Sequence, residues 1–291
     1  MGNPTVLHIR QFDIADKSKE FYSNTIENHL ATGHKNIHKP HRHNFYLTVL
    51  FTHGKGVHEI DFVKYDVKPG SLFFLNPGQM HHWELSEDIS GFIFFHTQSF
   101  YDLYFAGKSV NDFPFFQSVQ NTPALYLEEN RQAYFKLLFE QMHTENQSEY
   151  IFKQQKIISL IDLVYIESTR FYIGDSGSGK GKQHSYSNKF QEFEVFLEKY
   201  FKEEKLPSYY AGLLNISPKH LNRIVQDMVG KTATDIILER IFLEAKRELI
   251  VQKLPFSEIA YDLGYDDYAY FSRLFKKKCG VSPSEFVGRY R

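Results

Sequence analysis

Residues 5–125 alternate short apolar runs with turn residues. Turns containing Gly and Pro, such as Lys68 to Gly70 and Asn76 to Gly78, separate the runs. The runs are rich in β-branched and aromatic residues and lie at 45–51, 56–62, 71–75 and 91–95. Regularly spaced strands of this kind predict a β-sandwich or β-barrel.

The periodicity becomes helical between residues 128 and 172. Apolar residues recur there in two amphipathic segments, which Asn146 to Ser148 separate. We expect one apolar face to cover the β-domain, and a surplus face could pair with a second copy of the chain. The pattern by itself does not distinguish a dimer face from a core face. The N-terminal prediction is therefore a β-barrel with two flanking helices that also carry a homodimer contact.

A segment rich in Gly and Ser, residues 174–187, interrupts this pattern and predicts a flexible linker. A helix is expected to restart at residues 188–205, with Phe190, Phe193 and Leu197 in its apolar stripe. These boundaries divide the chain into a domain of residues 1–173, a linker of residues 174–187 and a domain of residues 188–291.

The C-terminal part contains one helix-turn-helix pattern twice. The two serines that open the copies are expected to N-cap the first helices, and Ser217 and Asp267 the second helices. Asn215 and Gly264 stand where the turn requires a positive φ. The paired positions are Ser208 with Ser257, Ala211 with Ala260, Leu214 with Leu263, Asn215 with Gly264, Ser217 with Asp267, Leu221 with Phe271 and Arg223 with Arg273.

The second helix of each copy has one apolar face and one polar face. The polar faces are those that would meet a DNA major groove. The candidate DNA-binding residues are Lys219, His220, Asn222, Arg223, Gln226, Tyr268, Ala269, Ser272, Arg273, Lys276 and Lys277.

Four separate blocks in this region carry a family resemblance. They run over residues 240–249, 256–265, 270–277 and 280–286, and together they resemble the DNA-binding domain of the AraC/XylS transcription regulators. That family joins two helix-turn-helix units by one long helix, which would be residues 234–251 here. The resemblance implies an all-α C-terminal domain that binds double-stranded DNA, and RNA polymerase as a further partner if the protein is an activator.

The charge distribution adds little support for DNA binding. The whole chain has a net charge of −1, with −4 over residues 1–173 and +2 over residues 188–291. Because the basic excess is slight, the DNA prediction depends on the motif rather than on bulk charge.

A single cysteine, Cys279, excludes a disulfide framework within the chain and suits a reducing compartment. No stretch approaches the roughly 20 apolar residues of a membrane span. Residues 1–10 also lack the features of a signal peptide. The sequence therefore predicts a soluble cytoplasmic protein with no membrane partner.

The turns between residues 67 and 81 resemble the cupin barrel, the usual sensor domain of AraC/XylS regulators. Many cupins bind a metal through histidines. His41 and His43 form a His-x-His pair, and His81 follows the turn at the spacing of the second cupin motif, so three ligands could converge.

The cupin pattern also expects a Glu a few residues after the histidine pair, and Tyr46, Leu47 and Thr48 stand there instead. A site of three histidines stays chemically possible. We nevertheless predict no metal and no cofactor, and assign these histidines to structure or to ligand contact.

The barrel interior is the candidate effector pocket. Phe45, Phe74, Trp83 and Phe94 could line it, or could simply fill the barrel. The candidates for ligand contact are His41, His43, His81, Trp83 and Glu84.

We therefore predict a sequence-specific transcription regulator whose cupin-like domain senses a small effector, and which is not an enzyme. Two alternatives stay open. One is a metal-binding cupin enzyme with an appended DNA-binding domain, and the other is a regulator whose N-terminal domain only mediates protein interaction.

Overall fold

The computed structural model divides the chain into two compact units, and the division falls between residues 177 and 178 of the predicted linker. We describe each unit by itself. The structure describes residues 6–12, 20–32, 39–104, 109–118, 121–173, 181–251 and 254–290.

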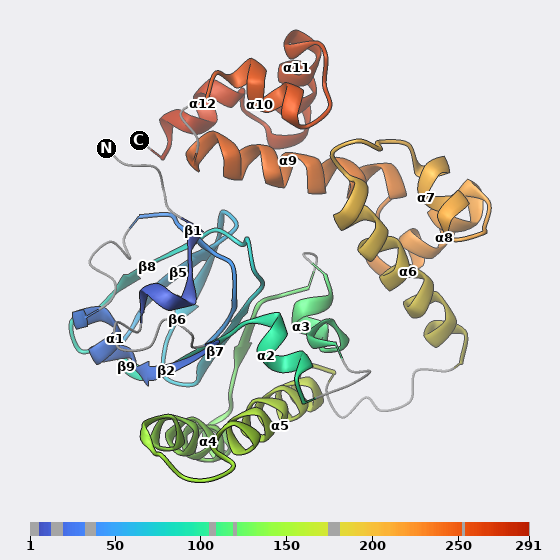
Figure 1. The fold of residues 1–291 in the computed structure, drawn as a ribbon. Coiled ribbons are helices and arrows are strands. Elements are labelled where there is room, and N and C mark those ends of the chain that lie inside the picture. The colour runs from blue at the N-terminus through green and yellow to red at the C-terminus, as the bar shows by residue number, and fades with distance from the viewer. Residues whose placement is uncertain are drawn as a thin grey trace. The chain divides into compact units, whose positions relative to one another are not determined.

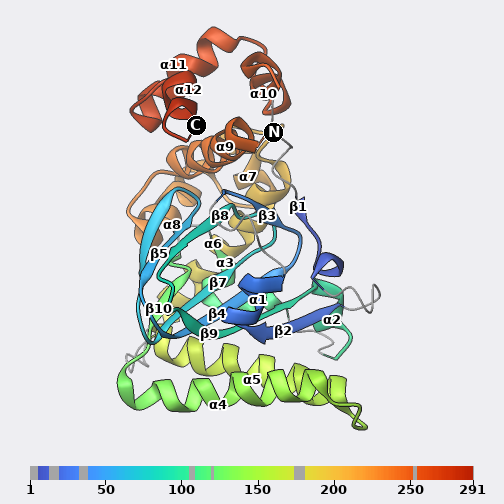
Figure 2. The ribbon, with the colours of Figure 1, turned by 90° about the vertical axis from the view of Figure 1, so that its left-hand side faces the viewer.

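The N-terminal unit contains two main antiparallel sheets (Figure 2). The five-stranded sheet has the order β10 (Ala124–Tyr126), β7 (Ser71–Leu75), β4 (Tyr46–His53), β9 (Ser90–His96) and β2 (Phe21–Thr25). The three-stranded sheet has the order β6 (Val63–Val67), β5 (Gly56–Ile60) and β8 (His81–Leu85). A short parallel pair, β1 (Val6–Leu7) and β3 (Arg42–His43), completes the strands of the described residues.

The five-stranded sheet is buried on both faces. Leu47, Val49 and Phe51 of β4 belong to the core between the two sheets, where Phe51 contacts Trp83 of β8. Tyr46 and Leu50 of the same strand belong to a second core on the opposite face. Burial on both faces explains why residues 45–51 are almost continuously apolar instead of alternating.

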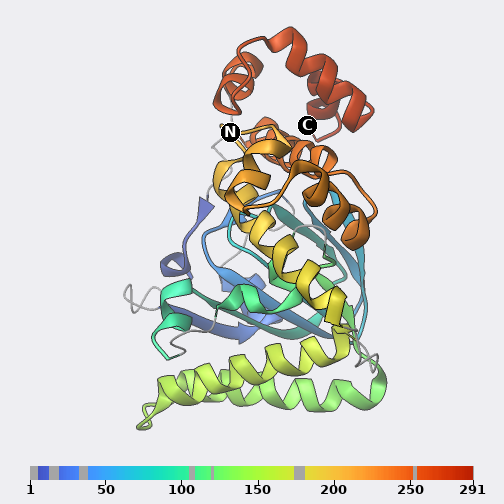
Figure 3. The ribbon, with the colours of Figure 1, turned by 90° about the vertical axis from the view of Figure 1, so that its right-hand side faces the viewer.

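Two long antiparallel helices cover the second face, as the side views show (Figures 2 and 3). They are α4 (Glu129–Gln147) and α5 (Lys153–Ile173), and their buried residues include Phe139 and Tyr165, which both contact Phe94 of β9. The two predicted flanking helices are thus confirmed. Closure of the sheets into a cupin-like barrel stays a prediction.

Short helices complete the N-terminal unit: α1 (Ile26–Thr32), α2 (Gln98–Asp102) and α3 (Pro114–Gln117), with 3-10 turns at Ile9–Gln11 and Val110–Asp112.

The C-terminal unit is all helical, and the predicted pair of helix-turn-helix units joined by one long helix is confirmed (Figure 1). The first unit is α7 (Pro207–Leu213) with α8 (Pro218–Val229), and the second is α10 (Phe256–Asp262) with α11 (Tyr268–Cys279). The joining helix α9 (Ala233–Val251) begins one residue before its predicted start. The short helix α12 (Pro283–Gly288) follows α11.

The linker prediction needs a correction. Helix α6 spans Gly181–Tyr200, so residues 181–187 are helical rather than coil, and residues 174–180 lie outside the described residues. The segment contains no proline, and Lys182 and Gln183 have high helix propensity, so a helix can extend upstream of Phe190. The predicted stripe of α6 is buried at Phe190, Phe193 and Leu197, and Phe193 packs against Tyr210 of α7.

Among the described residues, no helix has both the length and the apolar character needed to cross a membrane.

Candidate functional site

The second helix of each helix-turn-helix unit begins at the predicted cap. The Ser217 Oγ accepts a hydrogen bond from the His220 backbone N–H at 3.2 Å, and the Asp267 Oδ1 accepts one from the Ala269 N–H at 2.7 Å. Each bond satisfies one of the free N–H groups at a helix start. In both units, therefore, a side-chain N-cap fixes the start of the second helix.

The turns also match the prediction. Asn215 has a φ of 53° and Gly264 a φ of 74°. At Gly264 the backbone is additionally crowded, because a Cβ there would lie 2.3 Å from the Lys202 carbonyl oxygen. Only glycine meets both requirements at this position.

The predicted caps of the first helices are wrong. Helix α7 begins at Pro207 with Leu206 as its N-cap residue, and α10 begins at Phe256 after Pro255. Ser208 and Ser257 therefore lie inside the first turn. Pro207 has a fixed φ suited to the first helical position, which moves the helix start upstream of the serine.

The helices α8 and α11 bury one face and expose the other. Leu221, Ile224 and Val225 of α8 are buried, as are Phe271 and Phe275 of α11. The exposed predicted DNA contacts are Lys219, Asn222, Arg223, Gln226, Ala269, Arg273, Lys276 and Lys277, whereas His220, Tyr268 and Ser272 are half-buried.

Two polar contacts hold the second helices to α9. The Asn222 Oδ1 accepts a hydrogen bond from the Ala233 N–H at 3.0 Å, and the Lys278 Nζ lies 2.5 Å from the Asp235 Oδ1. Asn222 thus has a structural role at the start of α9, in addition to its predicted place on the DNA-binding face. Lys278 departs from the apolar stripe of α11 because it pairs with Asp235.

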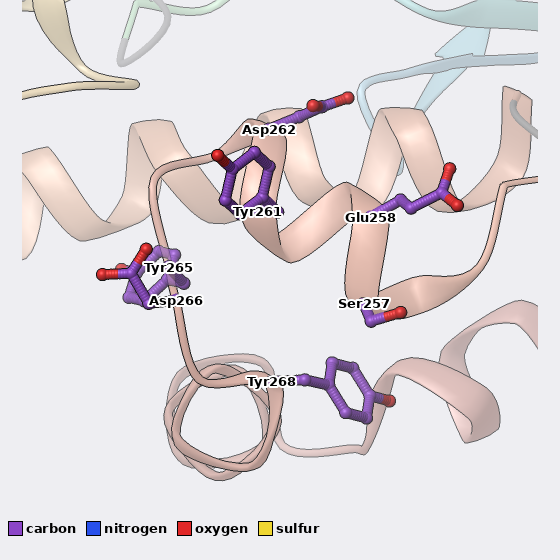
Figure 4. Close-up of a pocket in the computed structure, with 7 residues that line it drawn as sticks. All are labelled: Ser257, Glu258, Tyr261, Asp262, Tyr265, Asp266 and Tyr268. Carbon is purple, nitrogen blue, oxygen red and sulfur yellow. The ribbon is translucent and has the colours of Figure 1, made fainter.

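A pocket of about 340 Å³ lies between α10 and the start of α11 (Figure 4). Three carboxylates, from Glu258, Asp262 and Asp266, line it together with Tyr261, Tyr265 and Tyr268. Carboxylates repel phosphate, so Tyr268 has the least favourable surroundings of the predicted DNA contacts on α11.

The N-terminal unit brings three of the predicted ligand-contact histidines together. His41, His43 and His81 are all buried, and their ligand atoms lie within 4.8 Å of one another. An antiparallel bridge pairs His41 with His81, and the Nε2 atoms of His43 and His81 lie 2.5 Å apart. The convergence follows from backbone pairing between residues that are about 40 positions apart in the chain.

A fourth histidine, which sequence reasoning missed, belongs to the same cluster. The His58 Nε2 lies 2.9 Å from the His81 Nδ1, and the His58 side chain is fully buried. His58 is opposite Trp83 in the pairing of β5 with β8. Its position two residues before the apolar Ile60 was the available signal, because residues i and i+2 of a strand share a face.

Of the remaining two predicted ligand contacts, one lies beside the histidine cluster and the other does not. Trp83 is fully buried, and its ring contacts those of His58 and His81. Glu84 is wrongly placed by the prediction: its side chain is 66% exposed and lies 4.0 Å from His82. Strand alternation is the reason, since 81 and 83 face the interior and 82 and 84 the other side.

Two of the four candidate pocket aromatics are also corrected. Phe45 and Trp83 belong to the core between the sheets, but Phe74 and Phe94 belong to the core beneath α4 and α5.

Burial sets the charge state of the cluster. It lowers the pKa of His41 and, more strongly, that of His58, because a charged imidazole loses its hydration there. Both rings are therefore neutral at pH 7. A neutral imidazole has one nitrogen lone pair, so each ring can accept a hydrogen bond or bind a metal.

Two comparisons with family models agree with this geometry. A model described as an AraC-like ligand binding domain matches residues 25–161, and a model described as a helix-turn-helix domain matches residues 210–289. The first match contains the histidine cluster, and the second contains both helix-turn-helix units.

Full-length relatives cover both parts of the chain. The arabinose operon regulatory protein of Escherichia coli (strain K12) is 22% identical over 246 residues, which are 83% of this chain and 80% of the relative. The HTH-type transcriptional activator RhaS of Mannheimia succiniciproducens is 22% identical over 260 residues, 86% of this chain and 89% of the relative. The solved structure of ToxT from Vibrio cholerae is 14% identical, with a TM-score of 0.45 over 92% of this chain and 98% of ToxT.

With a ligand-binding domain before a double helix-turn-helix domain, and with transcription regulators as relatives along most of its length, the chain belongs to the AraC/XylS family of transcription regulators.

Proposed function

We propose that α8 and α11 bind two successive major grooves of one double-stranded DNA site. The observation that carries this proposal is the duplication itself: two recognition helices with the same cap and turn geometry, joined by α9. The 19 residues of α9 span about 28 Å at 1.5 Å per residue. Successive major grooves are about 34 Å apart, so a helix of this length suits a bipartite site.

The candidate DNA-contact residues divide into two classes by position. Lys219, His220 and Arg223 on α8, with Ala269, Ser272 and Arg273 on α11, lie in the first half of each helix, the part that enters the groove. Lys276 and Lys277 lie in the last turn of α11 and would contact phosphate.

Footprinting tests the bipartite site. We expect the full-length protein to protect two segments about one helical turn apart. Replacing Lys219, His220 and Arg223 together by Ala should remove the protection of one segment. Protection of a single groove, unchanged by this triple replacement, would contradict the proposal and leave the first unit as a spacer.

We further propose that the effector binds beside the histidine cluster. Two buried ring nitrogens support this: the Trp83 Nε1, a donor, and the His58 Nδ1, a donor or an acceptor depending on the tautomer, have no hydrogen-bond partner among the residues that the structure describes. Buried polar groups are normally satisfied, so two of them in one cluster are suited to polar atoms of a small ligand. His41, His43 and His81 would supply the other polar contacts.

A thermal-shift screen of the full-length protein with small metabolites tests the effector site. A ligand that binds the folded protein raises its melting temperature. The variant His43→Ala should lose that shift and keep basal DNA binding, whereas Glu84→Ala should keep both. A ligand whose shift survives the His43→Ala replacement would contradict this location.

The proposed partners follow from these activities. They are DNA, a small effector, a second copy of the chain, and RNA polymerase if the protein is an activator. As a DNA-binding regulator it would act in the cytoplasm, and we propose no enzymatic reaction for it.

A further inference from the structure

His41, His43 and His81 each bring one ring nitrogen within 4.8 Å of the others, and His58 contacts His81. We propose that His41, His43 and His81 bind one transition-metal ion through their Nε2 atoms, with His58 holding His81 in position. This proposal rests on the proposed function in one respect, because it takes the location of the effector site from there. It adds the chemistry by which that site would bind an effector.

The hydrogen bonds of the Nδ1 atoms direct the lone pairs of two rings toward the shared point. The His41 Nδ1 lies 3.0 Å from the Lys39 carbonyl oxygen, which can only accept, so Nδ1 carries the proton and Nε2 the lone pair. His81 has the same arrangement if its Nδ1 donates to the His58 Nε2 at 2.9 Å. Histidines that bind metals in proteins are typically fixed in this way by a partner on the second ring nitrogen.

The third ring faces these two. The Nε2 atoms of His43 and His81 approach to 2.5 Å, and the ring centroids of His41 and His81 are 4.4 Å apart. Nitrogens bound tetrahedrally to Zn²⁺ at about 2.0–2.1 Å stand about 3.3 Å apart. Donor atoms already within 4.8 Å of one another reach that spacing by small side-chain rotations.

The chemistry of the donor set selects the class of ion. Imidazole nitrogens suit Zn²⁺, Cu²⁺, Fe²⁺ and Ni²⁺, whereas Mg²⁺ and Ca²⁺ prefer oxygen ligands. The rings of Phe45 and Trp83 pack on the cluster, with Phe45 stacked on His43 at 4.6 Å and Trp83 against His81 at 5.1 Å. An apolar shell of this kind limits water access to a metal site.

Three neutral ligands would leave a bound ion its full charge, and its coordination would not be complete with protein ligands alone. Metal sites with three protein ligands commonly bind water or a ligand oxygen at the fourth. An effector with a carboxylate or hydroxyl oxygen would therefore bind the ion directly, close to the Trp83 Nε1 and the His58 Nδ1, which have no partner among the described residues.

The test titrates the chelator-treated full-length protein with Co²⁺, followed by visible absorption, and with Zn²⁺, followed by calorimetry. We expect one equivalent of either ion to bind, with Zn²⁺ displacing Co²⁺. His43→Ala and His81→Ala should lose binding. His58→Ala should retain it with an affinity reduced about 10- to 100-fold, as expected for a residue that positions a ligand.

The matched control is His82→Ala, because His82 neighbours His81 but lies on the other face of β8. It should bind Co²⁺ as the unchanged protein does. If the unchanged protein binds neither ion, or if His43→Ala binds as tightly as His82→Ala, the proposal is wrong. The proposal can still be contradicted if a variant fails to fold, because the unchanged protein must itself bind one equivalent of either ion.

Metal binding is measured without DNA and without effector, so the two proposals fail separately. A protein that binds no metal but responds to a metabolite in the thermal-shift screen overturns the metal site and leaves the effector site standing. A protein that binds Co²⁺ stoichiometrically supports the metal site even if no metabolite shifts its melting temperature.

Discussion

At the scale of single residues, Arg240 links helices α9 and α6 of the C-terminal unit. Its guanidinium is buried in α9, donates two hydrogen bonds of 2.6 Å to the Glu198 carboxylate of α6, and lies 3.9 Å from the centre of the Phe201 ring. A third bond of 3.2 Å reaches Glu244. The paired geometry with Glu198 is the bidentate form that arginine favours.

The replacement Arg240→Ala should lower the free energy of unfolding of the C-terminal unit by about 2–3 kcal/mol. The loss of a partner from a fully buried pair costs about 3–5 kcal/mol, and Glu198, with its side chain 60% exposed, can recover hydration. Denaturant unfolding measures the change. The exposed pair of Lys189 and Glu192 supplies the control, because Lys189→Ala should change stability by less than about 1 kcal/mol. Equal effects of the two replacements would contradict the role of Arg240.

His96 gives the N-terminal unit a pH dependence. It is fully buried, its Nδ1 donates to the Thr97 carbonyl oxygen at 3.0 Å, and its Nε2 accepts from the Tyr165 hydroxyl at 2.7 Å. Burial lowers the pKa of His96 to about 4, chiefly because the charged ring would lose its hydration.

The sign of the effect follows from the lowered pKa. Between pH 6.5 and about 4 the unfolded chain binds a proton at His96 that the folded protein does not. Stability should therefore fall as the pH drops through this range, by an amount on the order of 3 kcal/mol, and this contribution should level off below about pH 4. Thermal melts of His96→Gln across this range should show a shallower decline, and an unchanged slope would contradict the assignment.

At the scale of elements, the two recognition helices differ in charge. Helix α11 ends in Lys276, Lys277 and Lys278, whereas the last turn of α8 has no basic residue. Since Lys278 pairs with Asp235, Lys276 and Lys277 are the cations of that turn left for phosphate. We expect α11 to contribute more of the salt-dependent affinity and α8 more of the base contacts near its N-terminus.

Lys277→Ala should therefore weaken binding to all DNA sequences alike and reduce the slope of log K against log salt by about one unit. His220→Ala should instead cost about 1–3 kcal/mol at the preferred site and relax the preference at one base pair. Binding titrations at several salt concentrations, with specific and unrelated DNA, measure both. If His220→Ala changes the salt slope and Lys277→Ala changes the base preference, the assignment of base contacts to α8 and phosphate contacts to α11 is wrong.

The elements also show which features a single sequence can predict. Local signals were sufficient for α4, α5, α8 and α11, and for the caps Ser217 and Asp267, because capping and helical periodicity act within a few residues. Helix α9 was expected from the family resemblance. The start of α7 was missed when Pro207 was given less weight than Ser208. Strand β8 carries two histidines and a glutamate among its five residues, so its composition marks it less clearly than the other strands, although Trp83 was expected to lie on a strand.

The candidate site depended on longer-range information. His58 joins the cluster only through the pairing of β5 with β8, which no local pattern specifies. Phe74 and Phe94 could not be assigned to a face without knowing that α4 and α5 cover one side of the sheet. Glu84 was the avoidable error, because alternation from the buried Trp83 places it outside.

At the scale of the whole molecule, the N-terminal unit has an apolar surface on the hairpin of α4 and α5. Tyr134 and Leu137 of α4 are 44% and 48% exposed, although the same helix already has four buried apolar residues in the core beneath it. At the tip of the hairpin, Tyr150, Ile151 and Phe152 are also exposed. The surplus of apolar side chains agrees with the proposal that this hairpin carries a dimer contact.

Sedimentation of the full-length protein at micromolar concentration should accordingly show a dimer, and Leu137→Glu should convert it to a monomer. A charge placed in an apolar interface loses its hydration without gaining a partner. The control is Val63→Glu, which changes a valine that is 51% exposed at the start of β6 in the three-stranded sheet, and should leave the dimer intact. A protein that sediments as a monomer before any replacement would remove the dimer proposal. A dimer that both variants retain would place the contact elsewhere, and dimer loss in both would show that any added negative charge on this unit prevents association.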